Sequence, residues 1–368
     1  MTSPYPSPLP AWPGLTHLTV AAPDRILDLD RSLGQRQATW RFDVVDGVTG
    51  IHMGQITPVR QAGQIGHDAT RTTKRQLGLS LGVADAAAIN AITDRISVSM
   101  LVGGGVYPQG RFMFTADART VSTGGTRSTD TLVDEMFLVD QQISEGFPSV
   151  SALSVQEAVY ALIAGLPLLG ASVEPSPYAL VGSWAPGTTR GQILAALATQ
   201  GDYQTPWFDN NGIFRMIRTV DPGAAEPTLD FDRGNRVIRD SPTITSDLLS
   251  APNRFIVSSN AGAAQGVPIV GQYDVPPSAP HSIQNRGFVV PSVTTLQVGT
   301  PDQAAAAARQ LGLTQTIAVT AQLTTAPDPR HNSYDVVRWQ GANWLESGWS
   351  MTLAEGAPMS HTLRRGFV

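Results

Sequence analysis

In the stretch "SVQEAVYALIAGL", residues 154–166, the apolar residues change from the spacing of strands to the spacing of a helix, and this change divides the chain into regions. Ser154, followed three residues later by Glu157, forms a capping box, which predicts a helix N-terminus. Apolar residues then recur at helical spacing, at Val155, Val159, Leu162, Ile163 and Leu166. An amphipathic helix is therefore predicted between regions that have the pattern of strands.

A second helix and a hairpin follow this helix. The stretch "TTRGQILAALATQG" (188–201) predicts a helix, with Thr188 or Thr189 as its cap and Gly201 as its stop. In residues 205–220, the pair Asn211-Gly212 lies between apolar residues, and this pattern predicts a β-hairpin with a type I′ turn. Residues 150–222 thus predict a compact ααββ unit, within an insertion domain of residues 150–227.

Short strands bounded by turn residues are predicted on both sides of the insertion. Many such strands indicate a barrel or a sandwich. The predicted fold is mainly β with an α/β insertion, and its parts are a proline-rich arm and first strand (1–37), a first β domain (38–149) and a second β domain (228–368) with a long loop at 261–292. Predicted strands include 94–102, 130–143, 251–260 and 316–325, and the predicted helices in these domains span 84–92 and 300–313.

Composition narrows the possible functions. The chain has 368 residues, of which 42% are hydrophobic and only 15% charged, and a mostly neutral surface suits a protein packed against others. The absence of cysteine excludes disulfides and thiolate metal sites. A net charge of −5, with Lys74 as the only lysine, argues against nucleic-acid binding as the main role. With no signal peptide or apolar span, a soluble protein made in the cytoplasm is expected.

Several motifs have the residue types of functional sites, but each is expected to have a structural role. The glycine-rich "LVGGGVYPQG" (101–110) precedes a strand, not a helix, so a hairpin loop is expected there instead of a phosphate-binding loop. Asp134 and Glu135 would point to opposite faces of a strand. Asp230 and Asp232 would share a strand face or sit in a turn, without calcium-loop spacing.

The histidines show no metal-binding spacing. They occupy positions 17, 52, 67, 281, 331 and 361, and His67 is expected in a polar loop beside Asp68. In "DPRHNSYDVV" (328–337), Asp328, His331 and Asp335 could bind a metal or relay protons. Because the stretch lies between two predicted strands, it is interpreted as a polar loop with His331 at its tip. The sequence therefore predicts no catalytic, cofactor-binding or metal-binding residues, no cofactor and no enzymatic activity.

A family resemblance rests on several of these stretches. "PDPRHNSYDVVRW" and "WLESGWSMTLAEGAPMSHTLRR" resemble the C-terminal end of the tail-tip hub proteins, or minor tail proteins, of long-tailed actinobacteriophages. "GRFMFTADARTV", "DTLVDEMFLVDQQI", "TTRGQILAALATQGDYQTPWFDNNGIFRM" and "SAPNRFIVSSN" are similar to earlier segments of the same proteins. The resemblance covers roughly residues 38–368. It rests on the general character of these sequence segments and not on a catalytic motif.

The resemblance implies a baseplate hub at the virion tail tip. Each chain would supply two tube-type β-barrels and an α/β domain, and three chains would form a homotrimeric ring that matches the sixfold tail tube. Its partners would be the distal tail protein, the tail tube, the tape measure and the tip or fibre proteins, with no membrane and with DNA contact only as passage through the lumen. Since the chain ends at Val368, soon after the second barrel, cell-wall cleavage and receptor binding are expected elsewhere.

Two alternatives stay open at this point. One is the distal tail protein, a hexameric adaptor with one barrel, against which the double β block argues. The other is a cell-wall-degrading enzyme, which would need a carboxylate pair or a metal constellation that the sequence does not offer.

Overall fold

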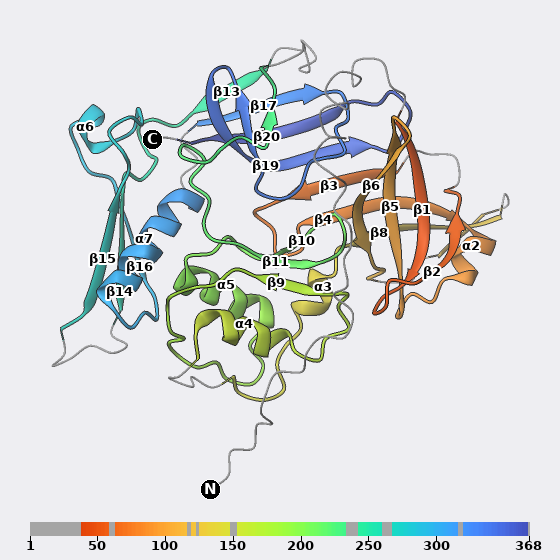
Figure 1. Cartoon of the computed structure of the whole chain (residues 1–368), viewed down its shortest axis with the longest axis horizontal. Coiled ribbons are helices and arrows are strands. Elements are labelled where there is room, and N and C mark those ends of the chain that lie inside the picture. Colours follow the sequence, from red (N-terminus) through yellow and green to blue (C-terminus); the bar gives the residue numbers. More distant parts are fainter. Residues whose placement is uncertain are drawn as a thin grey trace, which may run out of the picture.

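The computed structural model describes residues 38–58, 63–115, 119–122, 125–147, 153–232, 242–259, 267–315 and 319–366. The chain is mainly β, as predicted, and within these residues its strands form four sheets with short helices packed against them (Figure 1). The predicted arm and first strand (1–37) lie outside the described residues. None of the described helices combines the length and apolar character that a membrane crossing requires.

A four-stranded antiparallel sheet begins the described chain. Its order is β2-β1-β5-β6, with β2 (His52–Ile56), β1 (Thr39–Asp46), β5 (Asp94–Val102) and β6 (Gly105–Phe112). The short helix α2 (Val83–Ala88) precedes β5 and ends earlier than the predicted 84–92. The glycine-rich stretch forms the tight β5–β6 hairpin, as expected, with Gly103 and Gly104 at positive φ.

A larger sheet contains strands from both ends of the sequence. Its main path is β13-β17-β20-β19-β3-β4-β8-β7, with β18 paired to β19 and β12 paired to β18. The bounds are β3 (Gln64–Asp68), β4 (Arg75–Gly82), β7 (Arg119–Ser122), β8 (Gly125–Val133), β12 (Leu229–Asp230), β13 (Thr243–Ser246), β17 (Val319–Thr325), β18 (Val336–Trp339), β19 (Ala342–Thr352) and β20 (Met359–Arg365). The two β regions are joined where β19 pairs with β3 (Figure 1).

The hydrophobic core of the first β region also uses C-terminal residues. Trp349, Met351 and Met359 are buried in the same cluster as Leu77 and Val98. A separate cluster around Trp344 and Leu363 fills the C-terminal β region. Folding of the first region therefore depends on chain more than 200 residues further along, a long-range contact that local sequence patterns do not reveal.

The insertion has its own core, formed by α4 (Val155–Ile163), α5 (Arg190–Gly201) and a small sheet of β9 (Ala171–Val173), β11 (Phe214–Met216) and β10 (Trp207–Phe208). The predicted capping box of Ser154 with Glu157 is confirmed, and of the two predicted caps of the second helix, Thr188 and Thr189, the structure has Thr189, which forms a capping box with Gln192 that was not predicted. The helix α5 ends at Gly201, also as predicted.

The 205–220 hairpin is confirmed, but its predicted type I′ turn is wrong. A type I′ turn needs positive φ at both central residues, and only Gly212 (φ +78°) has it. The backbone N–H of Gly212 donates to Asp209 O, and the Asp209 carboxylate accepts from the backbone N–H groups of Asn211 and Ile213. The Asp209 side chain thus favours a turn in which Gly212 alone takes the left-handed position.

The segment expected as a long loop (261–292) contains regular structure. It holds β15 (Ile269–Asp274) and α6 (Ile283–Arg286), and it ends in β16 (Pro291–Thr295); residues 260–266 lie outside the described part. These strands form the sheet β15-β14-β16 with β14 (Arg254–Ser259), and the 15-residue helix α7 (Pro301–Gln315) covers one face. In these strands Gly271, Ser292 and Thr294 take the less exposed positions, whereas Val270 and Val293 are exposed, so the usual pattern of buried apolar residues is missing from the sequence.

The contact between α7 and this sheet is unusually close. A Cβ atom on Gly271 would lie 2.1 Å from the carbonyl carbon of Ala304 in α7. Glycine on the strand and alanines on the helix therefore allow the two backbones to approach, which explains the composition of both segments.

A further correction concerns 130–143, which was predicted as one strand. The strand β8 ends at Val133, and the short helix α3 (Met136–Val139) follows. Asp134 causes the break, because its carboxylate accepts the backbone N–H groups of Lys74, Arg75 and Met136.

Candidate functional site

The stretch 328–337 is an inter-strand segment, but His331 is not at an exposed tip. The His331 side chain is fully buried. Asp328 is paired with Arg330 at 2.5 Å, and Asp335 accepts the backbone N–H of Asn332. Nδ1 of the His331 ring contacts Glu346, and its Nε2 has no hydrogen-bond partner in the described structure, so neither carboxylate hydrogen-bonds to the ring.

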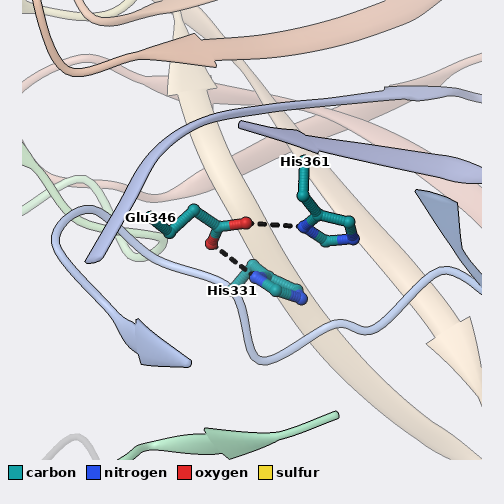
Figure 2. A group of neighbouring side chains, drawn as sticks. All are labelled: His331, Glu346 and His361. Atoms are coloured by element: carbon teal, nitrogen blue, oxygen red, sulfur yellow. Dashed lines mark hydrogen bonds and ion pairs between the residues drawn. The ribbon is translucent and has the colours of Figure 1, made fainter. Parts of the chain in front are cut away.

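The structure instead brings His331 to Glu346 and His361, which the sequence analysis did not connect (Figure 2). Nδ1 of His331 lies 2.6 Å from Oε2 of Glu346, and Nδ1 of His361 lies 2.6 Å from Oε1 of the same carboxylate. All three side chains are fully buried. This His–Glu–His cluster joins the segment after β17 to β19 and β20.

Strand pairing explains how the cluster forms. Glu346 on β19 pairs with Leu363 on β20, and His361 lies two residues before Leu363, on the same face of the strand. The register shifts between Glu346 and Gly348, a bulge-type irregularity that can re-aim a side chain. No spacing within either strand predicts the contact, because it depends on the register between them.

The cluster is electrostatically compensated. Burial raises the pKa of the Glu346 carboxyl, but the two imidazoles, His331 foremost, outweigh it and bring the pKa down to about 2. Burial lowers the pKa of His331, but the Glu346 carboxylate outweighs it and raises the pKa above its usual value. Burial keeps the pKa of His361 below its usual value. The arrangement is therefore a buried ion pair between His331 and Glu346 with His361 as a neutral second donor.

The geometry fits hydrogen bonds better than metal ligation. Donor atoms that share a tetrahedral zinc ion lie roughly 3.3 Å apart, because each bond measures about 2.0–2.1 Å. The two 2.6 Å contacts are shorter than this and match charge-assisted hydrogen bonds. Nε2 of His361 is also engaged, at 2.7 Å from Oγ1 of Thr325. The cluster is fully buried and holds three segments of the chain together.

The pair Asp134-Glu135 does not lie on a strand, contrary to expectation. Both residues follow β8 and are buried. Glu135 is 3.1 Å from Arg95 and 3.7 Å from Arg111, and burial raises its pKa. Asp134 is occupied by backbone donors, so the pair is structural.

The remaining candidates also take structural places. Asp230 lies on the strand β12, whereas Asp232 follows the strand and accepts the backbone N–H groups of Gln340 and Gly341, so neither expected arrangement holds for both residues. His67 was expected in a polar loop, but it lies buried on β3 with its ring 5.7 Å from that of Trp349. The surrounding alternation of glycine and polar residues concealed this strand.

Comparison with known proteins gives the fold a context. No family model and no curated protein matches the sequence. Among solved structures, the tail protein from Neisseria meningitidis MC58 has 16% identity and a TM-score of 0.58, covering 89% of this chain and 97% of its own. The 43 kDa tail protein of prophage MuSo2 from Shewanella oneidensis has 14% identity and a TM-score of 0.56, with 88% and 98% covered.

A third structure agrees with these two. The prophage tail protein gp18 from Listeria monocytogenes has 12% identity and a TM-score of 0.51, covering 88% of this chain and 94% of its own. The structural similarity spans nearly the whole of each protein. Because the sequence identity is so low, this similarity shows a shared fold and no more. The chain therefore has the fold of tail proteins, including two that prophages encode.

Proposed function

We propose that this protein is a structural component of a bacteriophage tail. The observation that carries the proposal is the fold likeness to three tail proteins over 88–89% of the chain. The His–Glu–His cluster is consistent with it, because its buried groups stabilise a scaffold and offer no access to substrate. The role is therefore assembly, without catalysis.

Within the tail, we propose the hub: a ring of three copies at the tip that joins the tail tube and distal tail protein to the fibre proteins. Each chain would contribute two barrel-like β regions. Three chains would therefore present six such regions, which match the sixfold symmetry of the tail tube. A head-to-tail ring needs two different contact surfaces on each subunit, one complementary to the other.

Two exposed apolar surfaces support such a contact. The first, called the hairpin patch, consists of Val48, Ile51, Met53 and Ile92 beside the β1–β2 turn. The second, called the sheet patch, consists of Val270, Phe288, Val289 and Val293 on and beside the sheet β15-β14-β16. They lie toward opposite ends of the molecule along its longest axis (Figure 1). Contiguous exposed apolar residues mark interaction sites, and we propose that a second copy covers each patch.

The test is the location and copy number of the protein in purified virions. Electron microscopy of tails carrying an antibody fragment against this chain should place it at the tail tip in three copies. Six copies would favour the distal tail protein. Clearing of a cell-wall suspension by the purified chain would contradict the non-enzymatic role.

A further inference from the structure

A cavity of about 590 Å³ lies where the structural units meet. Its wall is formed by the β3–β4 connection, α5, residues 204–206, α7 and parts of β19 and β20. Met136, Leu311 and Leu345 make part of this wall apolar. No aspartate or glutamate of the described chain lines the cavity.

Two buried cations line the same cavity. Lys74 is 2% exposed and Arg364 is 7% exposed. No described carboxylate comes within ion-pair distance of either one, whereas Arg71, the third cation of the wall, is paired with Asp68 at 3.1 Å. Buried charges are normally paired, so two of them facing a cavity without a carboxylate call for an explanation.

A structural role explains Lys74 only. Its Nζ donates to Ala69 O, Arg71 O and Thr205 Oγ1, which uses all three of its N–H groups. Arg364 differs, because the described structure gives its guanidinium a single hydrogen bond, from Nη1 to Thr314 O at 2.7 Å. A guanidinium has five N–H donors in a planar fork that matches an oxyanion.

Gln204 supplies an independent sign of a ligand. The residue lines the cavity, is 1% exposed, and its Nε2 has no hydrogen-bond partner in the described structure. A buried donor without an acceptor costs about 1–3 kcal/mol. Nε2 is covered by the cavity wall, so a ligand oxygen would remove this cost once the Gln204 side chain turns toward the cavity.

The protonation equilibria agree with this geometry. Burial lowers the pKa of Lys74 to about 8 and that of Arg364 to about 10. For Lys74 burial outweighs the attraction of Asp134 and Asp68, and no carboxylate offsets the burial of Arg364, so a bound anion would bring both pKa values back toward their usual range.

We propose that this cavity binds a small organic oxyanion, whose charged oxygens contact Arg364 and Gln204 under the attraction of Lys74 and whose apolar body packs on Leu311 and Leu345. Carboxylate and phosphate heads share this chemistry. The ligand would bridge the insertion, α7 and both β regions, and the inference does not depend on the hub proposal.

The test is isothermal titration calorimetry on the full chain at constant ionic strength. Benzoate and phenyl phosphate present one apolar body with two different anionic heads, and benzamide is their neutral counterpart. We expect one site per chain for at least one anion, and binding of benzamide at least tenfold weaker. The tighter anion identifies the head group as carboxylate or phosphate.

Variants separate a built site from general charge. Arg364→Gln should weaken anion binding at least tenfold, while Arg41→Gln, on β1 outside the cavity, removes one cation without this effect. Should Arg364→Gln fold poorly, Gln204→Leu keeps the wall and should weaken binding severalfold. The proposal is overturned if neither anion shows saturable binding, if benzamide binds equally well, or if the cavity variant that folds binds like the Arg41 control.

Discussion

Nδ1 of His331 lies 2.6 Å from Oε2 of Glu346, although the two residues are 15 positions apart and both side chains are fully buried. The contact ties the segment between β17 and β18 to the middle of the C-terminal hairpin. Because the pair is buried, removing one partner leaves an uncompensated charge in a low-dielectric interior.

Glu346→Gln should therefore destabilise the protein by about 3 kcal/mol, the range seen when a buried ion pair loses one partner. Urea unfolding at neutral pH measures the change. Glu355→Gln, in the exposed β19–β20 turn, is the matched control and should stay within about 0.5 kcal/mol of the parent. Equal stabilities of the two variants would show that the His–Glu–His cluster contributes nothing.

His67 should make the protein sensitive to acid. Burial, with the nearby cations Arg75 and Lys74, lowers its pKa to about 3 from 6.5, and neither ring nitrogen has a hydrogen-bond partner in the described structure. Between these pH values the unfolded chain binds a proton that the folded chain does not, so stability falls as pH falls, by about 1.4 kcal/mol per pH unit.

His67→Phe removes this proton and keeps an aromatic ring beside Trp349. Between pH 6 and 4, the unfolding free energy of the variant should change with pH less steeply than that of the parent, by about 1.4 kcal/mol per pH unit. Parallel pH profiles for parent and variant would show that His67 does not titrate as described.

The β10–β11 turn should depend on Gly212 for two reasons. Its φ of +78° disfavours any side chain, and a Cβ atom there would lie 2.3 Å from Cδ of Arg111. Gly287→Ala is the matched control, because its φ is +76° but a Cβ atom meets nothing within 4 Å. We expect the control to lose about 1 kcal/mol of unfolding free energy and Gly212→Ala to lose clearly more, as measured by chemical unfolding. Equal losses in the two variants would show that the contact with Arg111 adds no steric cost.

The two apolar patches should control self-association. Ile51 and Val293 are each 65% exposed, so Ile51→Glu and Val293→Glu should leave the monomer intact while weakening association at least tenfold in analytical ultracentrifugation. Ala161→Glu, on the exposed side of α4, serves as the control. Association unchanged in both patch variants would rule out these surfaces as the ring contact.

Local signals in the sequence predicted local structure well. The cap at Ser154 was found because a capping box lies within four residues, and the cap of the second helix was narrowed to Thr188 or Thr189 from neighbouring residues alone. The hairpin at 205–220 was found for the same reason, although its turn type was wrong because the Asp209 side chain reorganises the turn.

Features that depend on distant pairing could not be predicted. The contact of Glu346 with His331 and His361 requires the register of β19 against β20. In the sheet β15-β14-β16 the strand β14 was predicted, but β15 and β16 were missed because Gly271, Ser292 and Thr294 take their less exposed positions, so only the packing of α7 reveals them as strands. The cavity around Lys74, Gln204 and Arg364 draws residues from several units, and no single segment carries its signature.

We propose that this chain forms a threefold hub ring at the tail tip. The most direct measurement is cryo-electron microscopy of purified tails, with the density of this chain identified by fitting its fold. The account predicts three copies in a closed ring below the tail tube, with the hairpin patch of one copy against the sheet patch of the next. A ring of six copies, or tails that lack the protein altogether, would contradict it.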